Sequence, residues 1–99
     1  MVRRIIWSAS SKIDLFEILN YYFERNGNKT YSKKLNSDIR SSVKLLSSYP
    51  KLGIQTKTSN VRVLIEGRFG IFYRLKNHSI EIISLWDFHQ NPDNVKHKK

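Results

Sequence analysis

Two helical stretches joined by three residues constrain the fold of this chain more than any other feature of its sequence. The first stretch has apolar residues at helical spacing, namely Leu15, Ile18, Leu19 and Tyr22, widened by Phe16 and Phe23. The second has the same periodicity, in Tyr31, Leu35, Ile39, Val43 and Leu46. The link at residues 26–28 is short, so the two helices are expected to form an antiparallel hairpin. Neither helix can bury its apolar stripe alone, so the hairpin needs a second layer.

Local signals set the ends of both helices. Ser8 is placed to cap the first helix, and Ser11 with Asp14 offers a second capping box three residues later, so two starts remain open. Gly27 is expected to end this helix in the left-handed conformation. Pro50 ends the second helix, because the residue before a proline avoids the α region.

The rest of the chain has the pattern of strands. One strand is expected at residues 2–7 and three more at 61–66, 69–75 and 80–86, whereas the polar residues 51–60 are expected to form an exposed loop. The order β-α-α-β-β-β indicates a two-layer α+β fold, in which the helical hairpin packs on a mainly antiparallel sheet. We expect a single domain at residues 1–95 and a basic tail at 96–99.

Positive charge indicates the kind of partner. The chain of 99 residues has 18 Lys plus Arg against 8 Asp plus Glu, a formal net charge of +10. Such a field attracts polyanions, so nucleic acid, an acidic protein and an anionic membrane all remain possible partners, beside simple solubility. No cysteine is present, which excludes disulfides and thiolate metal sites. Charge alone leaves the membrane open, but without a signal peptide or a run of about 20 apolar residues we expect a cytoplasmic protein with no membrane partner.

Several short motifs together resemble the RelE/ParE superfamily of toxins. They are Ile6-Trp7-Ser8 before the first helix, the stretch from Leu46 through Tyr49-Pro50 to Gly53, the strand pair Arg62-Val63-Leu64 and Ile71-Phe72-Tyr73-Arg74, and the ending Trp86-Asp87-Phe88-His89-Gln90-Asn91-Pro92. The resemblance covers residues 2–93. It implies the toxin of a type II toxin-antitoxin system, which arrests growth and is neutralised by a cognate acidic antitoxin that folds on binding.

The resemblance leaves two targets open. A RelE-like toxin cleaves ribosome-bound mRNA without a metal, and Arg62, Arg74 and His89 are then the candidate catalytic residues, with Arg68 and Tyr73 as further candidates. Arginine would stabilise the charged phosphorane and histidine would transfer a proton. Arg62 also has a plain structural interpretation: it alternates with Val61 and Val63, which predicts that it lies on the solvent face of its strand.

Two departures favour the other target. RelE-type enzymes carry an arginine where this chain has Gly70, and the basic residue of the closing motif is replaced by His89. A ParE-like toxin needs no catalytic set, because it binds DNA gyrase and traps its cleaved-DNA state. A third interpretation is a non-toxic module that kept the fold and binds nucleic acid or protein. None of the three requires a metal, a cofactor or a small-molecule ligand.

Overall fold

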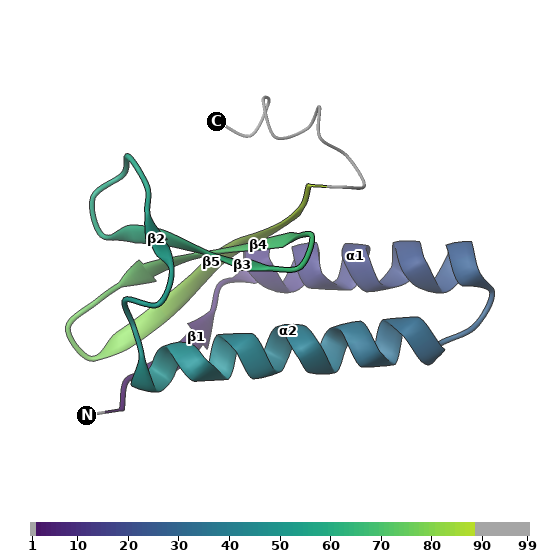
Figure 1. Cartoon of the computed structure of the whole chain (residues 1–99), viewed down its shortest axis with the longest axis horizontal. Coiled ribbons are helices and arrows are strands. Elements are labelled where there is room, and N and C mark those ends of the chain that lie inside the picture. The colour runs from purple at the N-terminus through teal and green to yellow at the C-terminus, as the bar shows by residue number, and fades with distance from the viewer. Residues whose placement is uncertain (1, 89–99) are drawn as a thin grey trace.

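The computed structural model describes residues 2–88, so His89 and the expected basic tail at 96–99 lie outside the described residues. The elements follow the order β1 (Arg4–Trp7), α1 (Ala9–Asn26), α2 (Thr30–Ser48), β2 (Ile54–Gln55), β3 (Val61–Glu66), β4 (Phe69–Leu75) and β5 (Ser79–Asp87) (Figure 1). The expected α+β order is confirmed. The short strand β2 is an addition, because it lies within the stretch for which only a loop was expected. Among these residues, no helix is long and apolar enough to cross a bilayer.

The five strands form one mixed sheet in the order β1-β5-β4-β3-β2. Strands β2 to β5 are antiparallel neighbours, whereas β1 runs parallel to β5 with Ile5 opposite Ile80. A parallel pair needs a crossover connection. The hairpin of α1 and α2, whose helices lie side by side in Figure 1, is the first part of that connection and lies on one face of the sheet.

Of the two expected N-caps of α1, the structure uses Ser8. The Ser8 hydroxyl oxygen accepts a hydrogen bond from the Ser11 amide at 3.0 Å, which caps the helix. Asp14 has a different role from the expected capping box, because its carboxylate accepts a hydrogen bond from the Leu85 amide of β5 at 3.0 Å. Gly27 ends the helix with a φ of 73°, as expected.

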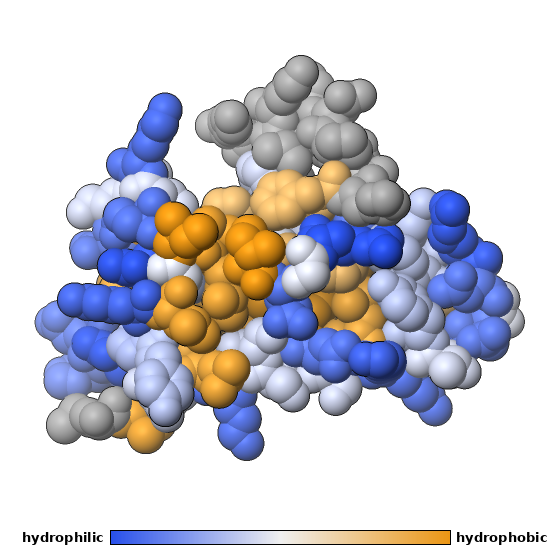
Figure 2. Space-filling model, in the orientation of Figure 1, coloured by the Kyte–Doolittle hydropathy of each residue, from blue (hydrophilic) through white to orange (hydrophobic). Residues whose placement is uncertain are grey.

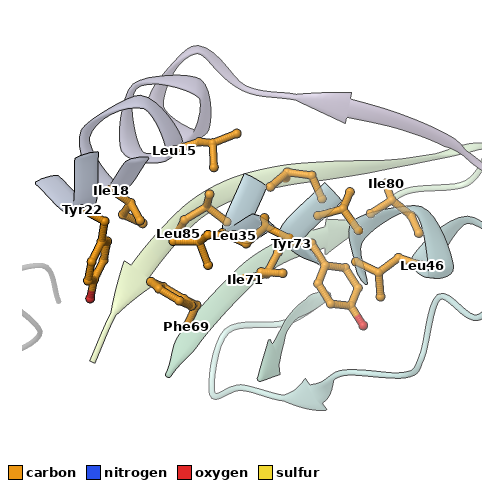
Figure 3. Close-up of a cluster of buried hydrophobic side chains, with 13 residues drawn as sticks. Leu15, Ile18, Tyr22, Leu35, Leu46, Phe69, Ile71, Tyr73, Ile80 and Leu85 are labelled. Atoms are coloured by element: carbon orange, nitrogen blue, oxygen red, sulfur yellow. The ribbon is translucent and has the colours of Figure 1, made fainter. Parts of the chain in front are cut away.

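The apolar core lies between the hairpin and the sheet. Figure 3 shows it as a continuous cluster in which Leu15, Ile18 and Tyr22 of α1 face the strand that carries Leu85. Ile39 and Leu46 of α2, like Ile71, Tyr73, Ile80 and Ile82 of the sheet, are fully buried. Phe16 is not part of this core, although the sequence pattern had added it to the apolar stripe, because 67% of its surface is exposed.

The core fixes which strand residues face the helices. Ile71 and Tyr73 of β4 are buried under the hairpin, and their cross-strand partners Leu64 and Arg62 of β3 therefore lie on the same face. The intervening residues lie on the opposite face, here called the open face, which no helix covers within residues 2–88. A register shift at Phe72/Tyr73 leaves one extra residue in β5. Two hydrogen bonds from Ser8, donated by its amide to Ile82 and by its hydroxyl to Ile83, hold this bulge in place.

Candidate functional site

The open face of the sheet is apolar at its centre. Val63 of β3 lies opposite Phe72 of β4, and Gly70 of β4 lies opposite Trp86 of β5. The rings of Phe72 and Trp86 are 4.9 Å apart between centroids, and that of Phe88 lies 6.0 Å from Trp86. These distances are typical of aromatic pairs. Phe72 of β4, Trp86 of β5 and Phe88 just after β5 therefore build one aromatic platform beside Val63.

Exposed aliphatic side chains extend this platform toward the edge of the sheet. Ile65 of β3 is 49% exposed and Ile54 of β2 is 66% exposed. Both belong to the open face, because Ile65 lies opposite Gly70 and Ile54 lies opposite Val63. In Figure 2, apolar side chains gather over β2 and the neighbouring part of the sheet. Contiguous apolar surface of this kind is typical of a site that binds another macromolecule.

Gly70 is required for this arrangement. A Cβ atom at residue 70 would lie only 2.6 Å from a ring carbon of Phe88, closer than such contacts occur. The Phe88 amide donates a hydrogen bond to the Arg68 carbonyl at 3.0 Å. This bond holds Phe88 beside the start of β4. At the position where RelE-type enzymes carry arginine, this chain therefore presents an aromatic ring.

Arg62 lies on the face opposite to the predicted one. It lies across from Tyr73 on the helix side of the sheet, whereas Val61 and Val63 belong to the open face, so the predicted solvent-facing orientation is wrong. Its Nη1 atom donates hydrogen bonds to the carbonyl oxygens of Gly53 at 2.6 Å and of Lys51 at 3.3 Å. The guanidinium therefore holds the loop that follows α2.

Tyr73 holds the same loop. Its hydroxyl donates a hydrogen bond to the Pro50 carbonyl at 2.8 Å and accepts one from the Gly53 amide at 2.9 Å. Burial raises the pKa of this phenol, against the lowering effects of the Gly53 amide and the Arg62 charge. Tyr73 is completely buried, so its hydroxyl is a structural link.

Arg74 lies on the open face, at its polar end. Its Nε atom is 3.7 Å from the Glu81 carboxylate, which also lies 3.5 Å from the Lys76 ammonium group. Because Arg62 and Arg74 lie in β3 and β4 on opposite faces, the structure does not bring these two predicted site residues together. His89, the third predicted residue, lies outside the described residues.

A polar cluster that the sequence did not predict joins α1 to the end of β5. The Tyr22 hydroxyl donates a 2.5 Å hydrogen bond to the Asp87 carboxylate, and Arg68 Nη1 donates to the Tyr22 oxygen at 3.3 Å. Burial and the hydrogen bond to Asp87 raise the pKa of Tyr22 to about 12. The cluster fixes the end of β5 one residue before Phe88, and thus supports the aromatic platform.

The fold, together with two comparisons with known proteins, defines a class of protein, the RelE/ParE superfamily toxins. A family model described as the ParE toxin of the type II toxin-antitoxin system parDE matches residues 5–92. The chain belongs to this family and is a type II toxin, a class that pairs with an antitoxin.

A solved structure agrees with this assignment. It is described as the chromosomal ParDE TA system from P. aeruginosa, and the match has a TM-score of 0.74 at 25% sequence identity. The match covers 85% of this chain and 94% of the other. No curated protein matches the chain by sequence.

Proposed function

We propose that this toxin acts by binding DNA gyrase and trapping its cleaved-DNA state, and that an acidic antitoxin neutralises it. Gyrase acts on the chromosome, so the toxin would act in the cytoplasm. The observation that carries the choice of binding over catalysis is the apolar open face. Its centre, at Gly70 and Phe88, is aromatic where RelE-type enzymes are cationic.

The open face has the properties of a protein-docking surface. Aromatic side chains in the middle of an interface supply much of its binding energy. Here Phe72, Trp86 and Phe88 form the centre, and the exposed side chains of Ile54 and Ile65 enlarge it. An apolar surface of this kind suits a folded protein better than a phosphate backbone.

The arrangement of the cations supports the same choice. RNA cleavage needs positive groups that converge on one phosphate, so that they stabilise the charge of the transition state. Arg62 is bound to loop carbonyls on the helix side, whereas Arg74 lies near Glu81 on the open face. The alternative to gyrase binding is RNA cleavage by Arg62, Arg74 and His89. In that case Arg62 would have to break its hydrogen bonds to the loop after α2.

The experiment that tests this function uses purified toxin, gyrase and supercoiled plasmid with ATP. We expect cleaved plasmid to accumulate once gyrase is denatured, and supercoiling to be inhibited. Absence of both effects would refute the gyrase proposal. Codon-phased mRNA cuts during translation would then support ribosome-dependent cleavage, and normal growth on overexpression would indicate a non-toxic module.

A further inference from the structure

The open face continues beyond the aromatic platform into a positively charged part. Arg4 of β1 lies beside Ser79 of β5, and the Ser79 carbonyl accepts a hydrogen bond from the Lys76 amide at 3.0 Å. These three residues therefore form one row across the sheet. In the next row, nearer the platform, Glu81 of β5 lies opposite Arg74 of β4. The three cations around Glu81, namely Arg4, Arg74 and Lys76, are here called the basic end.

The side chains of the basic end point away from the helices. Ile80 and Ile82 of β5 are fully buried in the core under the hairpin. Successive residues of a strand face opposite sides of the sheet, so Ser79 and Glu81 belong to the open face. Arg4, which lies beside Ser79, shares that face and is exposed. The basic end is therefore accessible from the same side as the aromatic platform.

The basic end has an excess of positive charge. The Glu81 carboxylate is the shared partner of Arg74 and Lys76, so one negative charge faces two cations. The side chains of these two cations remain 42% and 51% exposed. Arg4 has no carboxylate partner within the described part of the chain, residues 2–88. A polyanion that approaches this face therefore meets accessible positive charge.

The residue types of the basic end are those that contact phosphates. An arginine guanidinium binds two phosphate oxygens at once, a lysine supplies a point charge, and a serine hydroxyl such as that of Ser79 also bonds to phosphate. Arg4 and Lys76 are separated by two strand spacings, which places their Cα atoms about 10 Å apart. Groups spread in this way suit the repeated phosphates of a nucleic-acid backbone, since they do not converge on one reacting phosphate.

We propose that the basic end binds the phosphate backbone of the duplex DNA that gyrase holds in its cleaved state. The proposal rests on the proposed function, because that function places gyrase on the aromatic platform. Phe72 of the platform and Arg74 of the basic end are two residues apart on β4, about 7 Å along the strand. A partner that consists of protein and DNA together matches a surface with one apolar part and one cationic part.

Contact with DNA supplies a reason for trapping. A ligand shifts an equilibrium only by its different affinity for the two states. If the basic end holds DNA while the platform holds gyrase, the toxin binds the gyrase–DNA complex more tightly than gyrase alone. Duplex DNA has one negative charge for about every 1.7 Å of its axis, so cations about 10 Å apart can each meet a phosphate without a pocket. This charge density favours DNA over an acidic protein as the occupant.

The test compares two double substitutions that remove the same charge. Arg4→Gln with Lys76→Gln neutralises two cations of the basic end and is called the basic-end variant. Lys33→Gln with Lys44→Gln neutralises two exposed lysines of α2, on the hairpin, and is called the helix variant. Both lose two positive charges, so non-specific attraction to DNA falls equally. Circular dichroism of both variants confirms that they fold.

The first measurement is binding to immobilised gyrase, alone and in complex with a linear DNA duplex. We expect wild type and the helix variant to bind the complex at least ~10-fold more tightly than gyrase alone, from charge contacts with phosphates. The basic-end variant should lose this preference and bind gyrase alone as wild type does. For the complex, the slope of log affinity against log salt should be shallower by about 1.8, since each lost phosphate contact removes about 0.9. Equal behaviour of the two variants would overturn the proposal.

Free duplex DNA at low salt separates this proposal from the proposed function. The basic-end variant should bind the duplex more weakly than the helix variant. If wild type shows this DNA binding but no affinity for gyrase, the gyrase function fails and the basic end remains a DNA-binding surface. If wild type binds gyrase equally with and without DNA, the basic-end proposal fails and the gyrase function remains. Unchanged duplex affinity together with weaker antitoxin binding would assign the basic end to the acidic protein and overturn the proposal.

Discussion

Replacing Tyr73 by phenylalanine tests the link between β4 and the loop after α2. The hydroxyl makes two hydrogen bonds, to the Gly53 amide and to the Pro50 carbonyl. The Gly53 amide is buried and would lose its partner, at a cost of about 1–3 kcal/mol. The half-buried Pro50 carbonyl can gain water, so its loss adds about 0.5–1.5 kcal/mol. We therefore expect Tyr73→Phe to lower the free energy of unfolding by about 1.5–4.5 kcal/mol.

Urea denaturation followed by circular dichroism measures this change. Tyr49 supplies the matched control, because it lies close to the same loop and is 62% exposed. Tyr49→Phe should change the free energy of unfolding by less than about 0.5 kcal/mol. If Tyr73→Phe also lowers the free energy of unfolding by less than about 0.5 kcal/mol, the Tyr73 hydroxyl does not hold the loop.

Three further predictions follow from the described contacts. Gly70→Ala should destabilise the fold by about 1 kcal/mol in urea, because its methyl group displaces the tip of the Phe88 ring from the platform; a gain in stability would contradict the close approach of this ring to residue 70. Folding raises the Tyr22 pKa from 10.0 to about 12. The free energy of unfolding that neutral Tyr22 contributes is therefore constant below pH 10 and is lost as the pH rises from 10 to 12. Over that range wild type should lose about 1–2 kcal/mol more than Tyr22→Phe, and equal losses would contradict the burial of this phenol. Binding of the acidic antitoxin should weaken between about 0.1 and 0.5 M salt, because salt screens its attraction to a chain with a net charge of +10; constant affinity would indicate that apolar contacts alone hold the complex.

The sequence predicted the helices well because their signals are local. Ser8, Gly27 and Pro50 each act within one turn of the chain, and all three end or begin a helix where expected. Of the two starts that the sequence left open, the helix uses Ser8 and not Ser11, and the Asp14 carboxylate accepts a hydrogen bond from a strand 71 residues away. No local pattern contains a partner so distant in sequence.

The orientation of β3 was mispredicted because both of its faces are apolar. Val61, Val63 and Ile65 alternate with Arg62, which suggested that arginine faces solvent. Leu64 shares the face of Arg62, however, and packs against the core. Pairing with β4 therefore decides the orientation, and this pairing depends on the whole sheet. Strand β2 was missed because two residues are too few for a periodic pattern.

The sequence did not locate the open face, and it misplaced two exposed rings of α1. Phe16 and Phe23 lie seven residues apart, to one side of the stripe formed by Ile18 and Tyr22, which is typical of a helix with a second apolar strip. They were assigned to the core because a wide stripe and two adjacent strips have the same periodicity. The hydrogen bond of Tyr22 to Asp87 left no signal, because 65 residues separate the partners.

The open face is the proposed contact surface for gyrase, and one exposed side chain on it can be changed without touching the core. Ile65 tests it directly, because its side chain is half-exposed on that face and outside the core, so Ile65→Glu should fold. The measurement is the amount of cleaved plasmid that gyrase accumulates as toxin concentration rises. We predict that Ile65→Glu requires at least ~10-fold more toxin than wild type, and that Leu45→Glu, which changes an exposed side chain of α2, behaves as wild type. Trapping by Ile65→Glu at wild-type concentrations would contradict the assignment of the open face.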